Sequence, residues 1–112
     1  MAVVKFDTLR TKAAAAITGS YTTLGTPLTQ NWRMFKITNN TDGDLLISVD
    51  GTTDNLFVPA ESFTLYDLAT NAANVKDSDW FVMGLKVQFY VKYSTVPTSG
   101  DVWMEGLYST GV

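Results

Sequence analysis

The chain has 112 residues, a net charge of −3, 46% hydrophobic and 17% charged residues, and no His or Cys. This composition is too apolar for a disordered chain, and the length fits one domain. Without His and Cys, imidazole or thiolate catalysis, disulfides and Cys/His metal sites are excluded, so we expect no cofactor. The acidic balance argues against a nucleic-acid partner, which normally meets a basic surface.

The first 28 residues predict an arm followed by two strands. Residues 1–12 form the arm, which we expect to lie on a neighbouring molecule through its apolar side chains Val3, Val4, Phe6 and Leu9. A single β-sandwich domain is expected over 13–112, beginning with strands at 13–18 and 21–28. A helix at 13–16 is the open alternative, because alanine favours helices although four residues nucleate one poorly.

Strands and tight turns alternate between residues 32 and 58. Residues 32–38 predict a strand with Phe35 and Ile37 on one face and with Trp32 and Met34 on the other. A second strand is predicted at 44–50. Because Asn, Asp and Gly tolerate the positive φ of tight turns, the segment 39–43 predicts a hairpin between these two strands, and 50–55 a turn into a strand at 56–58.

The second half continues the same pattern. After the break at Pro59, a strand is predicted at 62–68, followed by a polar loop at 71–79 and a short apolar run at 80–83. The clearest alternation is at 85–93, which predicts a strand with one buried and one wet face. The last strand is predicted at 102–108.

These elements amount to about seven or eight short strands with turn signals every 8–12 residues and little helix. That spacing is typical of an all-β antiparallel sandwich or jelly-roll-like fold. No apolar run approaches the ~20 residues of a membrane-spanning helix, so no membrane association is expected. The run at 13–17 is also shorter than the roughly 7–15 apolar residues of a signal peptide.

Aromatic residues make up 12% of the chain and give its candidate interaction site. On their predicted strands Trp32 and Trp103 lie opposite the inward faces, and a two-sheet sandwich has only one interior. Outward indoles are natural interface anchors. The interface candidates are therefore Val3, Val4, Phe6, Leu9, Trp32, Met34, Trp80 and Trp103. A stack of a sugar ring on these aromatics is the alternative.

The acidic residues offer two further alternatives. Asp42, Asp44, Asp50 and Asp54 lie on adjacent turns, where they serve the backbone conformation or, alternatively, bind Ca²⁺. Glu61 and Glu105 are the two glutamates of the chain and would be the pair of a glycosidase. We expect ordinary surface carboxylates instead, and therefore no enzymatic activity.

Several stretches of the chain resemble small virion proteins of tailed bacteriophages. The resemblance spans roughly residues 13–108 and rests on 35–44, 47–55, 58–60, 65–68, 89–92 and 102–108. It implies an accessory head (decoration or cement), neck or tail component without catalytic activity, made in the cytoplasm of the bacterial host and located in the virion. Expected partners are copies of the chain itself, as a homo-oligomer, and other virion proteins. A carbohydrate- or receptor-binding β-sandwich module is the alternative function.

Overall fold

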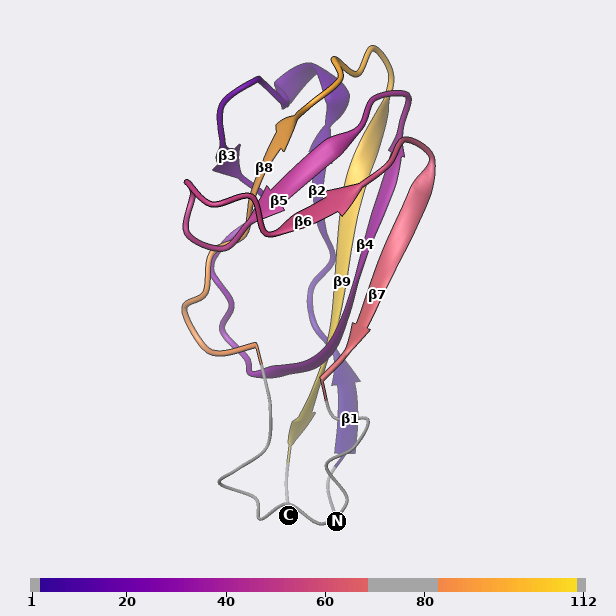
Figure 1. The fold of residues 1–112 in the computed structure, drawn as a ribbon. Coiled ribbons are helices and arrows are strands. Elements are labelled where there is room, and N and C mark those ends of the chain that lie inside the picture. Colours follow the sequence, from indigo (N-terminus) through magenta and orange to yellow (C-terminus); the bar gives the residue numbers. More distant parts are fainter. Residues whose placement is uncertain (1–2, 69–82, 111–112) are drawn as a thin grey trace.

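The computed structural model describes residues 3–68 and 83–110, and these fold into two antiparallel β-sheets packed face to face (Figure 1). Nine strands lie within this described part. The predicted all-β sandwich is confirmed. The predicted loop at 71–79 and Trp80 lie outside the described residues.

The larger sheet is built around two long strands, β4 (Trp32–Thr41) and β9 (Gly100–Thr110). On the far side of β4 lies β7 (Ser62–Asp67), and on the far side of β9 lie β1 (Val3–Phe6) and β2 (Arg10–Ala13), one beyond the other along β9. The order across this five-stranded sheet is therefore β1/β2–β9–β4–β7.

The smaller sheet has the order β3–β8–β5–β6. Its strands are short: β3 (Thr22–Thr23), β5 (Leu45–Ser48), β6 (Leu56–Val58) and β8 (Tyr90–Tyr93). The predicted turn at 50–55 is present, and it joins β5 and β6 as a hairpin. The strand predicted at 56–58 is found with those bounds, and the strands predicted at 44–50, 62–68 and 102–108 are present with ends moved by at most two residues.

The N-terminal region differs from its prediction. Residues 3–6 and 10–13 pair with the chain's own β9, so a separate arm at 1–12 is wrong for the described residues. A 3-10 helix at Ala14–Ala16 replaces the predicted strand at 13–18. The backbone N–H and C=O groups of residues 3–6 and 10–13 find their hydrogen-bond partners on β9, which is distant in the sequence. The local sequence alone could not reveal this pairing.

The hairpin predicted at 39–43 is also wrong, because β4 and β5 belong to different sheets. The chain crosses between the sheets at a corner held by the buried side chain of Asn39. Its amide nitrogen donates to the backbone oxygens of Gly43, Val58 and Pro59, at 2.8, 3.0 and 3.1 Å. Its amide oxygen accepts from the backbone N–H and hydroxyl of Thr41. One amide thus ties the corner to the β6–β7 turn.

The strand predicted at 85–93 is shortened to β8. Lys86 adopts a φ of 68°, so residues 85–86 form a turn, and Leu85 is exposed. Residues 86–89 instead exchange backbone hydrogen bonds with Leu24 and Leu28. Phe89 and Val91 still enter the core, as the alternation predicted.

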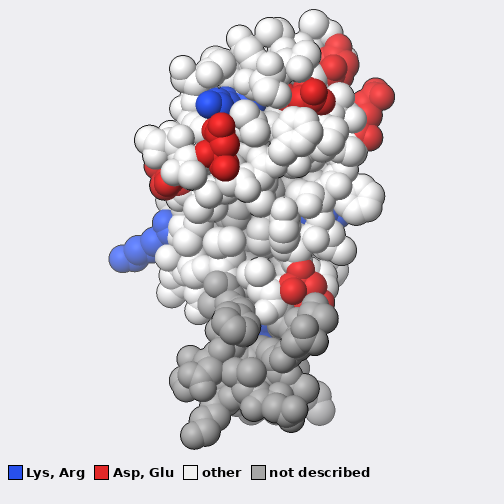
Figure 2. All heavy atoms as spheres, viewed as in Figure 1, with Lys and Arg blue, Asp and Glu red and all other residues white. Residues whose placement is uncertain are grey.

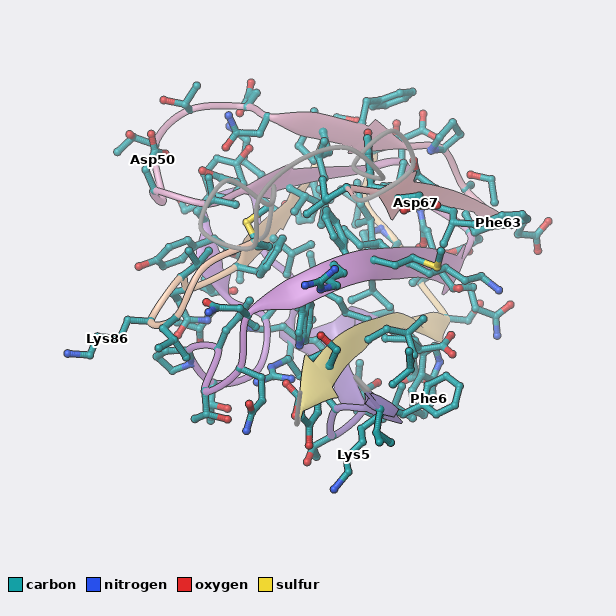
Figure 3. All side chains as sticks on the ribbon, turned by 90° about the horizontal axis from the view of Figure 1, so that it is seen from below. Lys5, Phe6, Asp50, Phe63, Asp67 and Lys86 are labelled. Carbon is teal, nitrogen blue, oxygen red and sulfur yellow. The ribbon has the colours of Figure 1, made fainter. Side chains whose placement is uncertain are left out.

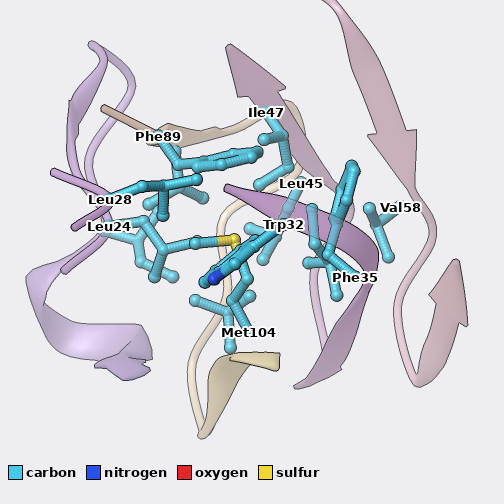
Figure 4. Packing of buried hydrophobic residues seen from close by; sticks show 13 residues of the cluster. Leu24, Leu28, Trp32, Phe35, Leu45, Ile47, Val58, Phe89 and Met104 are labelled. Atoms are coloured by element: carbon cyan, nitrogen blue, oxygen red, sulfur yellow. The ribbon is translucent and has the colours of Figure 1, made fainter. Parts of the chain in front are cut away.

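The core between the sheets is centred on Trp32, whose side chain is fully buried (Figure 4). Its ring stacks on Phe89 and lies near Phe35, with centroids 6.0 and 6.2 Å apart. The indole lies against Gly106 of β9, where a Cβ would come within 2.1 Å of it. Only glycine leaves room for this ring.

The prediction that Trp32 faces outward is therefore wrong, and an irregularity in β4 is the reason. Trp32 pairs with Tyr108 and Met34 with Leu107, so that Arg33 is an extra residue in the ladder. A bulge of one residue moves the preceding side chain to the other face of the sheet. Trp32 therefore shares the inner face with Phe35 and Ile37, while Met34 stays outside.

We predict that Trp32→Ala lowers the free energy of unfolding by about 3–5 kcal/mol, because it empties the centre of the core. Trp103→Ala is the matched control, since Trp103 is half-buried on the outer side of β9. Urea unfolding followed by circular dichroism measures both. Equal losses for the two variants would contradict the assignment of the two indoles to different faces.

Asn39→Ala is expected to cost at least about 2 kcal/mol, because buried carbonyl groups lose their donor. The exposed neighbour Asn40→Ala should change stability by less than about 0.5 kcal/mol. The same urea experiment distinguishes them. A stability of Asn39→Ala equal to that of the wild type would show that the corner does not depend on this amide.

Candidate protein-binding face

The outward surface of the five-stranded sheet is unusually apolar. We call it the outer face and define it by the apolar side chains Phe6, Leu9, Met34, Phe63, Leu65, Trp103 and Leu107. They come from every strand position across the sheet. Phe6 belongs to β1 and Leu9 directly precedes β2, and the others lie on β9, β4 and β7. Leu107, Phe6, Met34 and Leu65 line one shallow hollow, and Leu9 and Trp103 line a second beside it.

The exposure of these side chains is large for a soluble surface. Phe6 is 79% exposed, Phe63 61%, Leu65 53% and Leu9 50%. Figure 3 shows Phe6 and Phe63 pointing away from the molecule on the same side, while Asp50 and Lys86 lie on the opposite side. A contiguous apolar surface of this kind usually marks a site that another molecule covers.

Two opposite charges lie in the middle of the outer face. Lys36 of β4 and Glu105 of β9 are directly opposed in the strand register, and both line the two hollows. The ammonium of Lys36 lies 4.7 Å from the ring centroid of Phe63, a cation–π contact. Within residues 3–68 and 83–110 neither charge takes part in an ion pair.

The structure brings together four of the predicted interface residues, Phe6, Leu9, Met34 and Trp103, and Val4 lies beside them in an adjoining hollow. Val3 is exposed but precedes Val4 in β1 and so points to the other side of that strand. Trp32 is buried in the core and is therefore not part of this surface. Trp80 lies beyond the described residues.

The sequence reasoning missed Phe63, Leu65 and Leu107 as site residues. A signal for two of them was available, because Phe63 and Leu65 alternate with Thr64 and Tyr66 along β7. Tyr66 stacks on Phe35 in the core, with ring centroids 5.2 Å apart, so its neighbours must face outward. Recognising them required knowing which face of β7 is buried.

The acidic turns serve the backbone. The backbone N–H groups of Thr53 and Thr52 donate to the Asp50 carboxylate at 2.7 and 2.8 Å, and the hydroxyls of Thr53 and Ser48 donate to it as well. These donors hold the pKa of Asp50 well below its usual range. Asp54 accepts from the Tyr21 hydroxyl and lies 3.4 Å from the Lys92 ammonium, and the Tyr21 contact lowers its pKa.

Asp42 and Asp44 connect loops in the same way. Asp42 accepts from the hydroxyl and the backbone N–H of Thr98 and from Ser99, which lowers its pKa. The carboxylate of Asp44 accepts from the backbone N–H of Ala60 at 2.9 Å. Among the described residues, no group of three or more acidic side chains is placed to hold a metal ion.

The two glutamates lie far apart. The backbone N–H of Glu61 donates to Thr41, at one end of β4, whereas Glu105 is opposite Lys36. These points are five positions apart along the strand, about 17 Å at 3.4 Å per residue. Glycosidase carboxylates lie roughly 5–9.5 Å apart. This geometry does not fit a catalytic pair.

Charge is sparse on the side of the molecule that Figure 2 shows, and most of its acidic side chains lie in the half farther from β1. Basic side chains on that side are isolated and form no stripe among the described residues. Across 3–68 and 83–110, no helix has the length and apolarity to span a membrane.

A scan of family models and a search of curated proteins both find no match. Among solved structures the chain is similar to the Dit (gp 19.1) protein of phage SPP1, described as a paradigm of the hub adsorption apparatus in phages that infect Gram-positive bacteria. The two are 15% identical, with a TM-score of 0.41. The likeness covers 96% of this chain and 49% of that one, so this chain spans about half of its length.

We predict that Asp50→Asn is less stable than the wild type at pH 7, and that the difference narrows as the pH falls below about 4. The pKa of Asp50 is depressed in the folded state. The carboxylate therefore stabilises the fold above its unfolded pKa of about 3.9, and this contribution disappears as it protonates. Urea titrations at pH 7, 4 and 2.5 measure it. A difference independent of pH would contradict the assignment.

Proposed function

We propose that this chain is a non-enzymatic structural protein of a tailed-phage particle, an accessory head component or a neck or tail component. It acts through repeated protein–protein contacts of the outer face. The observation that carries the proposal is the apolar surface between Phe6 and Phe63, which a solitary molecule would leave in water. The virion part of the proposal rests on the sequence resemblance.

The physical requirements of a particle agree with this surface. The outer face lies on β4 and β9, the two longest strands of the described residues, and is backed by the core that surrounds Trp32, so it is a rigid platform. Copies on a symmetric particle are held close together, and a weak contact then suffices because the effective concentration is high. No catalytic group is needed for this function.

A carbohydrate- or receptor-binding module is the second candidate function, and one hollow of the outer face favours it. This hollow is lined by Trp103, Leu9, Lys36, Thr38 and Glu105. An aromatic ring beside hydroxyl, ammonium and carboxylate groups offers both a stacking surface and hydrogen-bond partners to a sugar. Glycan binding that Trp103→Ala abolishes would favour this second function.

Incorporation into particles tests the proposal. Phe63→Ser on the outer face should reduce the amount of the chain that copurifies with phage particles at least tenfold. Phe57→Ser is the matched control, because Phe57 is 54% exposed but lies on β6 of the other sheet. Quantitative mass spectrometry of purified particles measures both variants, after thermal unfolding has shown that they fold. Equal incorporation of the two would overturn the role of the outer face.

A further inference from the structure

The central row of the outer face has a symmetric composition. Across the sheet it reads Leu9, Glu105, Lys36, Leu65, in the column order β2–β9–β4–β7. Glu105 is opposite Lys36, and Lys36 is opposite Leu65. Arg10 pairs with Met104, which places the preceding Leu9 beside Glu105. Two leucines thus flank a negative and a positive charge.

This row is complementary to itself. A two-fold axis that lies in the interface, parallel to the strands and midway between β9 and β4, places β4 of one copy over β9 of the other. Lys36 then meets Glu105 of the second copy, Glu105 meets its Lys36, and Leu9 meets its Leu65. An isologous interface requires this reciprocity of contacts.

We infer that the partner of the outer face is a second copy of this chain, packed face to face about this axis with two reciprocal Lys36–Glu105 ion pairs. This inference rests on the proposed function, in which the outer face is the contact surface. Beyond that function, the molecule bound there is a second copy of the chain, in the orientation set by the two-fold axis.

In the two neighbouring rows the inner columns agree with this axis, whereas the outer columns place Phe6 over Asp67 and Thr11 over Phe63 of the second copy. Leu107 and Met34 are opposed in the strand register. The two-fold axis therefore places Leu107 of one copy over Met34 of the second copy, and Met34 over its Leu107. On the other side of the central row, Trp103 and Thr38 are opposed and exchange in the same way. Because facing sheets cross at about −30°, the axis bisects the strand directions of the two copies, about 15° from each, and the match is closest at the central row.

Charge selects this axis over the axis in the same plane that is perpendicular to the strands. An axis perpendicular to the strands through the central row would place Lys36 on Lys36 and Glu105 on Glu105, two like-charge contacts. Opposite charges that meet within an apolar surface favour one register, and like charges reject the other.

The contact is expected to be weak between two free molecules. Four strands about 4.8 Å apart and three rows about 7 Å apart cover about 400 Å² in plan. Counted on both copies this is about 800 Å², below the roughly 1,200–2,000 Å² of stable specific interfaces and in the range of weak contacts. The pair therefore becomes populated at high protein concentration or where a particle holds the copies together.

Complementary charge reversals test the inference. K36E gives a copy with two negative charges in the central row, and E105K gives a copy with two positive charges, so each alone should dimerise at least tenfold more weakly than the wild type. An equimolar mixture of K36E and E105K should form a heterodimer at wild-type strength. Sedimentation velocity over a concentration series measures all three.

The control pair reverses charge elsewhere. K86E and E61K alter exposed residues outside the outer face, so each should dimerise like the wild type, and their mixture should show no preference for the heterodimer. A wild-type chain that is monomeric at millimolar concentration, or a K36E/E105K mixture no stronger than either variant alone, would overturn the inference.

Cysteine cross-linking gives the register independently, because the chain has no native cysteine. In one copy Leu9 and Leu65 are three strand spacings apart, about 14 Å, too far for a disulfide. A mixture of L9C and L65C should form an intermolecular disulfide under mild oxidation, and neither variant alone should do so efficiently. Equal cross-linking of each alone and of the mixture would contradict the axis.

The two-fold dimer and the proposed virion function can be refuted independently of each other. If Phe63→Ser abolishes incorporation into particles while the charge reversals have no effect on dimerisation, the outer face binds another protein and the two-fold inference fails alone. If the charge reversals behave as expected while the wild-type chain is absent from purified particles, the dimer exists and the proposed virion function fails.

Discussion

The one-residue bulge between Trp32 and Met34 determines how this sequence divides its apolar side chains. Without it, both residues would point to the same side of β4, and the core would lose its largest ring. With it, the indole fills the space between the sheets against Gly106, and Met34 remains on the outer face. The same irregularity thus completes the interior and contributes to the apolar exterior.

The N-terminal strands depend on that indole. The Trp32 ring nitrogen donates to the Asp7 carboxylate at 2.8 Å, and the same oxygen lies 3.5 Å from the Arg10 guanidinium. Arg10 is 6% exposed and covers the Trp32 ring at 5.1 Å. This cluster fixes the connection between β1 and β2, so that Phe6 and Leu9 lie on the outer face beside β9. The core and the proposed contact surface are therefore coupled through a single buried side chain.

Local patterns predicted the fold class and most of the strands, because alternation and turn chemistry act over a few residues. They placed β5, β6, β7 and β9 and the Asp50 turn. They failed where distant backbone decided the outcome: the pairing of residues 3–13 with β9, and the corner at Asn39, whose partners include Val58 and Pro59. Phe6 and Leu9 were predicted as the apolar side chains of an arm, and Met34 and Trp103 as outward residues of their strands; the structure places all four on the outer face. Trp32 was misplaced, since no feature of its own sequence neighbourhood indicates the bulge.

The central claim is that another protein molecule covers the outer face. Hydroxyl-radical footprinting of the chain, free at low concentration and within assembled particles, tests it directly by comparing oxidation of Met34, Phe63 and Trp103 with that of Phe57. We expect strong protection of the first three in the particle and unchanged oxidation of Phe57. Equal oxidation of the outer face in both states would contradict the claim.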